Sequence, residues 1–156
     1  MGCAGIARRA YLVADGYARH RRAFGQKIIN FPLVQEMLGE LRAISSVLLA
    51  GGLEVAALAD QDEKGTLDQE QQAFLRVATN LIKMRSCQHS HRAVLTGIET
   101  LAGNGAIESF SVLPRLLRDN VVYENWEGTH NTLIAQTARD FLRSGLHQGF
   151  LSLIHI

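Results

Sequence analysis

Three short groups of residues in this sequence carry types that can take part in chemistry. Arg21 to Gly25 joins arginines to a phenylalanine, and a guanidinium binds phosphate through charge-assisted hydrogen bonds. Leu101 to Gly105 is a run of small residues that lets a ligand approach the backbone closely. Taken alone, the first group is equally an exposed basic patch and the second a simple helix stop.

The third group is Trp126-Glu127-Gly128-Thr129. A carboxylate beside an aromatic ring can lose its hydration and then act as a general base. The Thr129 hydroxyl can cap a helix or hold a cofactor group. For the tripeptide alone, helix capping is the simpler interpretation.

Long helices must position these groups. The chain has only two prolines, Pro32 and Pro114, so long stretches lack helix breakers. Apolar residues recur at helical spacing and predict helices at about 4–22, from 31 or 32 to about 58, at 68–101, and from 129–131 to about 142. Phe24-Gly25 is expected to end the first helix. Gly51-Gly52 interrupts the apolar stripe of the second, which costs helix propensity but would permit close packing against a neighbour. We expect residues 106–126 to be irregular or short-helical, because Pro114 bars one continuous helix.

Helices of this kind joined by short links predict an all-α, antiparallel four-helix bundle. We assign it to residues 1–146, followed by a tail at 147–156. The last six residues, LSLIHI, resemble the translated end of a transposase adapter used in sequencing libraries. They are therefore expected to be non-native, the alternative being a short native apolar tail.

Composition excludes several classes of protein. The chain has 156 residues, 47% of them hydrophobic, and a net charge of +1, which favours neither nucleic acid nor an anionic membrane. Two cysteines make no disulfide framework, and the longest apolar runs fall short of the roughly 20 residues of a membrane span. The expectation is a cytoplasmic domain with no membrane partner.

A metal site at Cys87, His89 and His91 is the weakest alternative. On a helix only Cys87 and His91 share a face, which leaves too few ligands for a closed zinc site. No metal is therefore expected.

Order and spacing change the interpretation of the three groups. YARHRRAFGQKI, a long helical pair, and ETLAGNGAIESFSVLPRLLRDNVVYENWEGTHNTL together resemble the C-terminal helical domain of the acyl-CoA dehydrogenases. That family has R-x-x-F-G after the first helix of this domain, a Gly-Gly-x-Gly loop after the third, and R-D followed by E-G-T before the last. Here Arg118-Asp119 precedes Glu127-Gly128-Thr129, and the resemblance covers nearly all of residues 4–143.

The resemblance implies a role for each matching residue. Arg21 and Phe24 would contact FAD, with Arg21 near the diphosphate, and the glycine loop would approach the same dinucleotide. Glu127 would remove the α-proton of an acyl-CoA thioester while the flavin takes the β-hydride. The cofactor-binding residues implied in this way are Arg21, Phe24, Gly103, Asn104, Gly105 and Thr129.

The chain departs from the usual family pattern at four places. Glu99 stands where glutamine is usual, Ala102 replaces the first glycine of the loop, and Trp126 replaces the usual tyrosine. A glutamine common at the start of the second helix is replaced around Pro32. This combination is similar to the AidB-like alkylation-response branch, for which weak dehydrogenase activity and DNA binding have been proposed.

The resemblance also implies partners. An enzyme of fatty acid metabolism would take acyl-CoA as substrate, pass electrons to an unidentified acceptor, and form a homodimer or homotetramer through this domain. As a fragment without the N-terminal helical and middle β domains, the chain is expected to be inactive alone. The rival classes are a DNA-contacting module that uses Arg8, Arg9, Arg19, Arg21 and Arg22, and a structural oligomerisation bundle.

Overall fold

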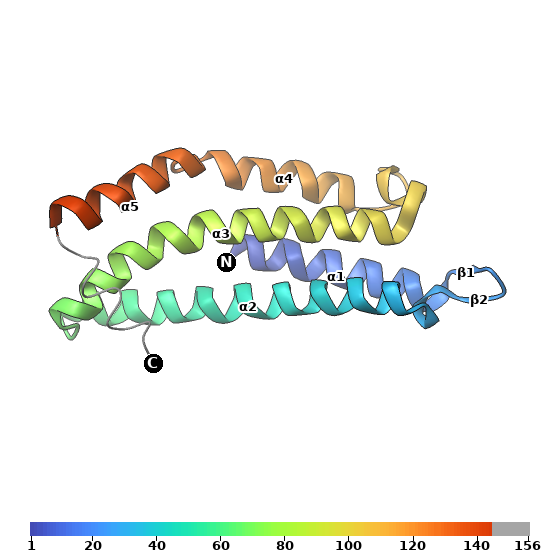
Figure 1. Ribbon diagram of the computed structural model, residues 1–156, viewed down its shortest axis with the longest axis horizontal. Coiled ribbons are helices and arrows are strands. Elements are labelled where there is room, and N and C mark those ends of the chain that lie inside the picture. Colours follow the sequence, from blue (N-terminus) through green and yellow to red (C-terminus); the bar gives the residue numbers. More distant parts are fainter. Residues whose placement is uncertain (145–156) are drawn as a thin grey trace. The chain divides into compact units, whose positions relative to one another are not determined.

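The computed structural model describes residues 1–144, and the side chains of residues 1–142. Its elements, labelled in Figure 1, are α1 (Gly2–His20), β1 (Arg22–Ala23), β2 (Gln26–Lys27), η1 (Ile28–Asn30), α2 (Pro32–Glu63), α3 (Gln69–Leu101), η2 (Ala102–Ala106), α4 (Leu113–Asn125) and α5 (His130–Ser144). The tail predicted at 147–156, including the non-native segment, lies outside the described residues. The helices divide between two compact units.

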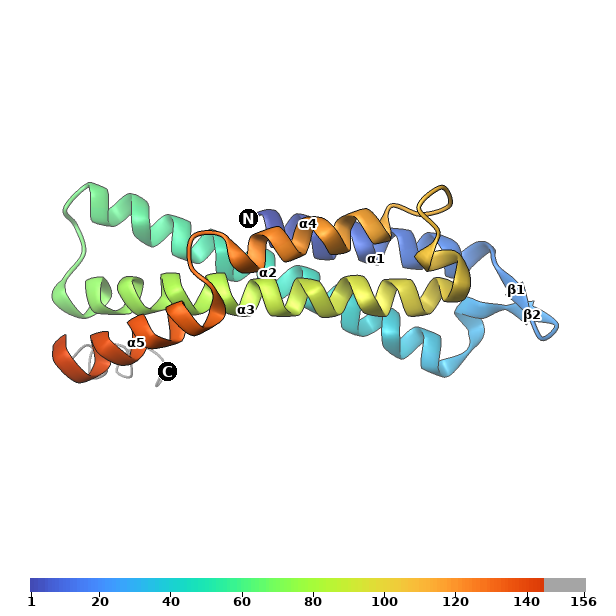
Figure 2. The same cartoon turned by 90° about the horizontal axis from the view of Figure 1, so that it is seen from above.

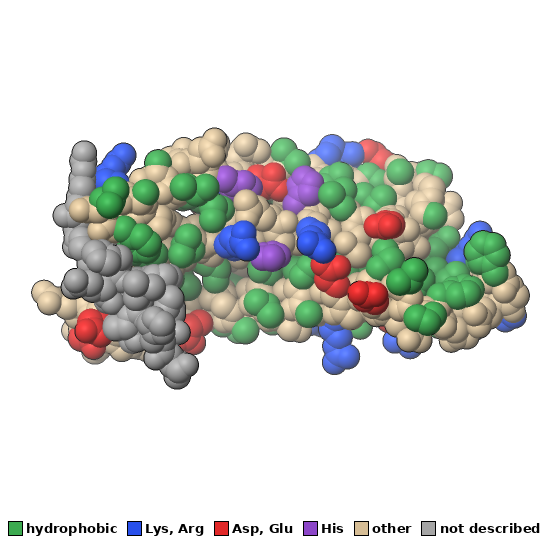
Figure 3. Space-filling view, in the orientation of Figure 1, with side chains coloured by type: hydrophobic (Ala, Val, Ile, Leu, Met, Phe, Trp, Pro, Cys, Tyr) green, Lys and Arg blue, Asp and Glu red, His purple; other side chains and the backbone are tan. Residues whose placement is uncertain are grey.

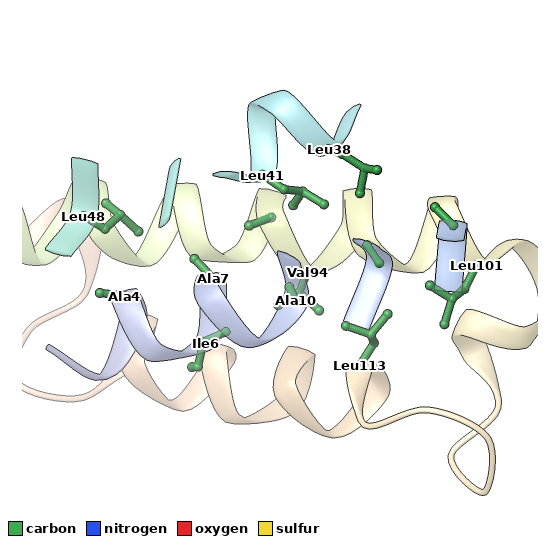
Figure 4. Packing of buried hydrophobic residues seen from close by; sticks show 13 residues of the cluster. Ala4, Ile6, Ala7, Ala10, Leu38, Leu41, Leu48, Val94, Leu101 and Leu113 are labelled. Carbon is green, nitrogen blue, oxygen red and sulfur yellow. The ribbon is translucent and has the colours of Figure 1, made fainter. Parts of the chain in front are cut away.

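Unit 1 comprises Met1–Leu49 and Ser86–Tyr123. Within it, α1, the first part of α2, the second part of α3 and most of α4 pack around one apolar core. Leu41 and Leu113 are fully buried there, with Val94 on α3 (Figure 4). The predicted all-α architecture of four packed helices is confirmed.

The buried face of α1 is made almost entirely of alanine. Ala7, Ala10, Ala14 and Ala18 are each 0% exposed, and they recur at the spacing of one helix face. Small side chains let helix backbones approach closely: a Cβ added at Gly97 on α3 would lie 3.6 Å from Ala10 Cβ. This close approach holds the end of α1 against the end of α3.

A buried polar cluster joins α3 to α4 in unit 1. Ser90 and Asn120 are both 0% exposed. The Ser90 hydroxyl donates to Asn120 Oδ1, and Asn120 Nδ2 donates to the Cys87 carbonyl at 3.0 Å. Buried polar groups are tolerated when each finds a partner, so this cluster sets how α4 lies along α3.

Unit 2 comprises Ala50–Arg85 and the chain from Glu124 onward. In it α5 runs alongside the first part of α3 (Figure 2), and Arg76 Nε donates to Asp140 Oδ2 at 3.0 Å. A Cβ added at Gly51 would lie 3.1 Å from Ile82 Cδ1. Gly51 on α2 therefore permits the close packing that the sequence led us to expect, and the helix continues through it.

A reciprocal cap fixes the start of α3, which the sequence predicted at residue 68 from apolar periodicity alone. Gln71 N donates to Asp68 Oδ1 at 2.8 Å, and Asp68 N donates to Gln71 Oε1 at 3.1 Å. This reciprocal pair satisfies two backbone donors that the first turn of a helix leaves unpaired. Pro32 likewise stands at the first position of α2, where its missing N–H costs nothing.

Two expectations about the helices need correction. The first helix ends at His20, and Gly25 serves a hairpin turn that follows it. Residues 113–125 form a regular helix, α4, because Pro114 falls in its first turn, where proline is tolerated.

Some apolar residues that follow the helical spacing, and were for that reason expected to face inward, are exposed. Val47 is 69% exposed, Leu95 45% and Ile134 52%. Ala138 on the same face of α5 is also exposed. Helical spacing identifies an apolar face, but it does not say how much of that face the rest of the chain covers.

The sequence analysis expected no segment of membrane-spanning length, but helix α2 has that length. By length and composition it is apolar enough to cross a membrane, with a mean hydropathy of 1.6 over its most apolar window. Leucine, isoleucine, valine and alanine supply this hydropathy, and serine and glycine interrupt them, so that no conspicuous apolar run forms. A single such helix is weak evidence, because core helices of soluble proteins meet the same criterion.

Candidate functional site

The first motif forms a tight hairpin just after α1. Arg22 pairs with Lys27 and Ala23 with Gln26, which leaves Phe24 and Gly25 as the two turn residues. Their φ values are 49° and 84°, and turns with positive φ at both central positions match the twist of paired strands. Glycine takes this conformation freely, and the turn leaves the Phe24 side chain 95% exposed.

The second motif forms the short helix η2 at the end of α3. Ala102 has a φ of 52°, a conformation that glycine adopts without strain, so a glycine at this position of the family loop has a physical reason. Asn104 Nδ2 donates to Tyr17 Oη at 3.1 Å. This bond ties the loop to α1.

Gly105 has a structural reason of its own. A Cβ at this position would lie 2.5 Å from the Ile98 carbonyl oxygen, and Gly105 is buried. Gly103, in contrast, has nothing within 4 Å of an added Cβ. Only Gly103 of the two lines the open space beside the loop.

That space is a groove of about 690 Å³ in unit 1. It brings together four of the predicted cofactor-binding residues, Arg21, Phe24, Gly103 and Asn104. Apolar side chains gather at this end of unit 1, around the β1–β2 hairpin (Figure 3). The other lining residues are Tyr17, Ala23, Ile28, Phe31, Pro32, Leu33, Val34, Thr100, Leu101 and Ala102.

Arg21 differs from the arginines next to it. Arg19 donates to both oxygens of Asp15, and this hydrogen bond together with the Asp15 charge raises the pKa of Arg19 above its ordinary value. Arg22 donates to the Gly25 carbonyl at 3.1 Å within the hairpin. Arg21 lines the groove and, among residues 1–144, pairs with no carboxylate.

These groups fit an aromatic dinucleotide such as FAD. The Arg21 guanidinium suits a diphosphate, and the Asn104 amide lies in the same wall of the groove. Phe24 and Phe31 meet edge to face with their ring centroids 6.3 Å apart, which offers an apolar surface to a planar ring system.

The third motif lies in unit 2, between α4 and α5. Glu127 has a φ of 51° and an exposed side chain, and Gly128 has a φ of 106°. The Leu133 N–H donates to the Thr129 carbonyl at 3.0 Å, and the Thr129 and Thr132 hydroxyls lie 3.1 Å apart. Thr129 thus caps α5, as the simpler interpretation of the tripeptide required.

Sequence reasoning missed most of the apolar wall of the groove. Tyr17 and Val34 follow helical spacing within the predicted helices, and none of the three motifs includes them or Phe31. Tyr17 in fact contributes a hydroxyl to Asn104 and an edge-to-face contact with Phe110 at 6.1 Å between ring centroids. Its position four residues before Arg21 was the available signal, since residues at that spacing share a helix face.

No metal centre accompanies these motifs within the described part of the chain. Residues 1–144 place no three His, Cys, Asp or Glu side chains where they could hold an ion. The Cys87 thiol donates to the Tyr123 carbonyl at 3.3 Å and is buried.

A comparison with protein-family models identifies the family of this chain. Residues 1–142 match the model described as "Acyl-CoA dehydrogenase, C-terminal domain". The chain belongs to the acyl-CoA dehydrogenase family. The order of the three motifs in the sequence predicts the same family.

Curated relatives agree with the assignment. The chain is 31% identical over 137 residues to acyl-CoA dehydrogenase family member 11 of Caenorhabditis elegans. The matched region covers 88% of this chain and 22% of the relative. It is 27% identical over 139 residues to the putative acyl-CoA dehydrogenase AidB of Escherichia coli, covering 89% and 25%. The chain therefore spans about a quarter of each relative. The identity to AidB does not exceed that to the worm protein, so the family is shown and the AidB-like branch is not singled out.

Solved structures of acyl-CoA dehydrogenase relatives share the fold. The Bd2924 apo form has 33% identity and a TM-score of 0.91, over 98% of this chain and 31% of that one. C. elegans ACDH-11, solved in complex with C11-CoA, has 30% identity and a TM-score of 0.84, over 90% and 24%.

Proposed function

We propose that this chain is the C-terminal domain of an FAD-dependent acyl-CoA dehydrogenase that oxidises the α,β bond of an acyl-CoA thioester. The observation that carries the proposal is the groove in unit 1. It collects Arg21, Phe24, Gly103 and Asn104 from segments about eighty residues apart in the sequence. Its lining contains the groups that a dinucleotide needs: the cation of Arg21 and the aromatic rings of Phe24 and Phe31.

Each residue of the proposed site has a defined task. Arg21 binds the diphosphate, Phe24 contacts the cofactor rings, and the loop at Gly103 and Asn104 lets the dinucleotide approach the backbone. Thr129 and the start of α5 offer an N-terminal helix end to an anion. Glu127 removes the α-proton as a general base. Bound FAD would supply the acceptor for the hydride that leaves the β-carbon of the substrate.

The exposed apolar surface of α2 supports a partner for this domain. Leu33 is 73% exposed and Val47 69%, and both lie on one face of the part of α2 that belongs to unit 1. Exposed apolar patches commonly mark protein interfaces. We assign this surface to homodimer or homotetramer contacts. The isolated chain spans only about a quarter of its curated relatives, and we expect no acyl-CoA turnover from it alone.

An AidB-like flavoprotein with little dehydrogenase activity is the second candidate. The 27% identity to AidB favours it, as do Glu99, Ala102 and Trp126 at positions where most of the resembling dehydrogenases differ. A DNA-binding role would draw on Arg8 and Arg9, which are both exposed on α1.

Flavin spectroscopy of the complete protein tests the proposal. Oxidised flavin should co-purify with the protein and bleach when a matching acyl-CoA from a panel of chain lengths is added. Bound flavin that no thioester bleaches would support the AidB-like candidate, which salt-sensitive binding to duplex DNA would then examine. Protein without flavin would overturn both candidates.

Replacing Phe24 with alanine should weaken FAD binding without destabilising the protein. The side chain is 95% exposed, so the free energy of unfolding of the flavin-free protein should change by less than about 0.5 kcal/mol. Loss of an aromatic contact should raise the Kd for FAD by roughly 2- to 10-fold. FAD titration of the apoprotein, followed by flavin fluorescence, measures the Kd.

Val122→Ala, on α4 of the same unit, is the matched control. Val122 is also apolar and exposed, at 58%, but it does not line the groove and has no assigned interface role, so Val122→Ala should leave the Kd unchanged. Equal affinities for Phe24→Ala and the unmodified protein would remove Phe24 from the cofactor site.

A further inference from the structure

The turn that carries Glu127 holds its backbone in an unfavourable conformation. Glu127 and Gly128 both have positive φ, 51° and 106°. An amino acid with a Cβ is disfavoured there because the Cβ crowds the following carbonyl oxygen. Such a conformation persists only where the surrounding structure imposes it, so some contact must hold Glu127 in place.

Lys83 on α3 makes that contact within unit 2. Its Nζ donates to the Gly128 carbonyl oxygen at 2.6 Å and to the Glu124 carbonyl oxygen at 3.1 Å. The two acceptors lie on either side of Glu127 in the sequence, so one ammonium group bridges the two ends of the turn. Glu124 is in the last turn of α4, where carbonyls lack helical partners and a cation is favoured.

The far side of the turn is fixed by packing and capping. A Cβ at Gly128 would lie 3.3 Å from Leu133 Cδ2, so the first turn of α5 closes against the glycine. Thr129 Oγ1 caps the same helix by accepting from the Thr132 N–H at 3.5 Å. Between these two restraints, the exposed Glu127 side chain projects from the turn.

We propose that Lys83 is a positioning residue for Glu127: its two hydrogen bonds hold the turn in the left-handed conformation that aims the carboxylate. The proposal rests on the proposed function, in which Glu127 is the general base. A misplaced base lowers the rate of proton transfer even when the substrate still binds. Lys83 therefore acts on catalysis through the backbone of the turn and touches no reacting atom.

Lys83→Met tests the proposal, since it keeps an unbranched chain of similar length and removes the charge and all donors. In the 156-residue chain, amide hydrogen exchange over residues 124–132 should become at least about tenfold faster, because local opening no longer breaks two hydrogen bonds. Lys64→Met, at an exposed lysine of the same unit, is the control and should exchange at the original rate. Unchanged exchange in Lys83→Met would overturn the proposal.

Kinetics of the complete protein separate positioning from general stability. For Lys83→Met, kcat and kcat/KM should fall together by roughly 10- to 100-fold, as expected for a displaced catalytic group. Lys83→Arg keeps a cationic donor and should recover part of the loss. A rise in KM with unchanged kcat would overturn the positioning role.

The same kinetic assay distinguishes a failure of the Lys83 proposal from a failure of Glu127 as the general base. If Glu127→Gln retains full activity, the assignment of Glu127 as base fails, whatever Lys83 does. If Glu127→Gln is inactive and Lys83→Met is fully active, the base stands and the positioning role of Lys83 fails. Should Lys83→Met not fold, Lys83→Leu, which also removes the charge and all donors, takes its place with the same expectations.

Discussion

Replacing Glu127 with glutamine in the complete protein is expected to abolish bleaching of the flavin by acyl-CoA. Glutamine keeps the size of the side chain but cannot accept a proton as a carboxylate does. Loss of a general base typically slows a reaction about 10²- to 10⁴-fold. Stopped-flow absorbance of the oxidised flavin band, with acyl-CoA in excess, measures the rate directly.

Glu99→Gln is the matched control for this experiment. It makes the same chemical change on an exposed residue of α3 and installs the residue that the resembling dehydrogenases usually carry there. Its bleaching rate should equal that of the unmodified protein. A Glu127→Gln variant that bleached at the original rate would show that the base lies elsewhere.

The second large effect is expected at Gly105, where alanine should destabilise unit 1. The added Cβ would meet three backbone atoms of Ile98 at 2.5, 2.8 and 3.0 Å. Backbone cannot move aside as a flexible side chain can, so either η2 or the end of α3 must shift. Overpacking of this kind costs about 1–3 kcal/mol or more, measurable as a lower free energy of unfolding in urea.

Gly103→Ala isolates the cause. Gly103 lies two residues earlier in the same short helix but has nothing within 4 Å of an added Cβ. Its free energy of unfolding should stay within about 0.5 kcal/mol of the original value. If the two variants were equally stable, the close approach of Gly105 to Ile98 would not be a constraint on the fold.

Gly105 also shows where the family resemblance and the structure explain one residue differently. The resemblance implied that the whole glycine loop approaches the dinucleotide. In the structure Gly103 and Asn104 line the groove, whereas Gly105 is buried against α3. A glycine in a binding motif can thus be required by packing behind the site, which motif matching alone does not distinguish.

The turn at Phe24-Gly25 was misassigned for a related reason. Glycine ends helices and also occupies tight hairpin turns, because both need a positive φ. The dipeptide alone does not say which, and the first helix in fact ends at His20. Only the pairing of Arg22–Ala23 with Gln26–Lys27 shows that the turn belongs to a hairpin, which presents Phe24 beside the groove.

The sequence by itself determined the features that depend on neighbouring residues. Pro32 at the start of α2 and the Asp68–Gln71 cap of α3 act within one helical turn, so their effect can be predicted from local sequence. The all-α class and the order of the three motifs followed from the same local signals, and they sufficed to indicate the family.

Tertiary structure alone decided which distant residues meet and which apolar faces are covered. Arg21 and Asn104 share a groove because the alanine face of α1 brings the end of that helix against the end of α3. Lys83 reaches the turn at Glu127 because α3 passes beside the end of α4 and the start of α5 in unit 2. These contacts join residues more than forty positions apart, and helical periodicity carries no information over that distance, since it describes one face of one helix and not its neighbour.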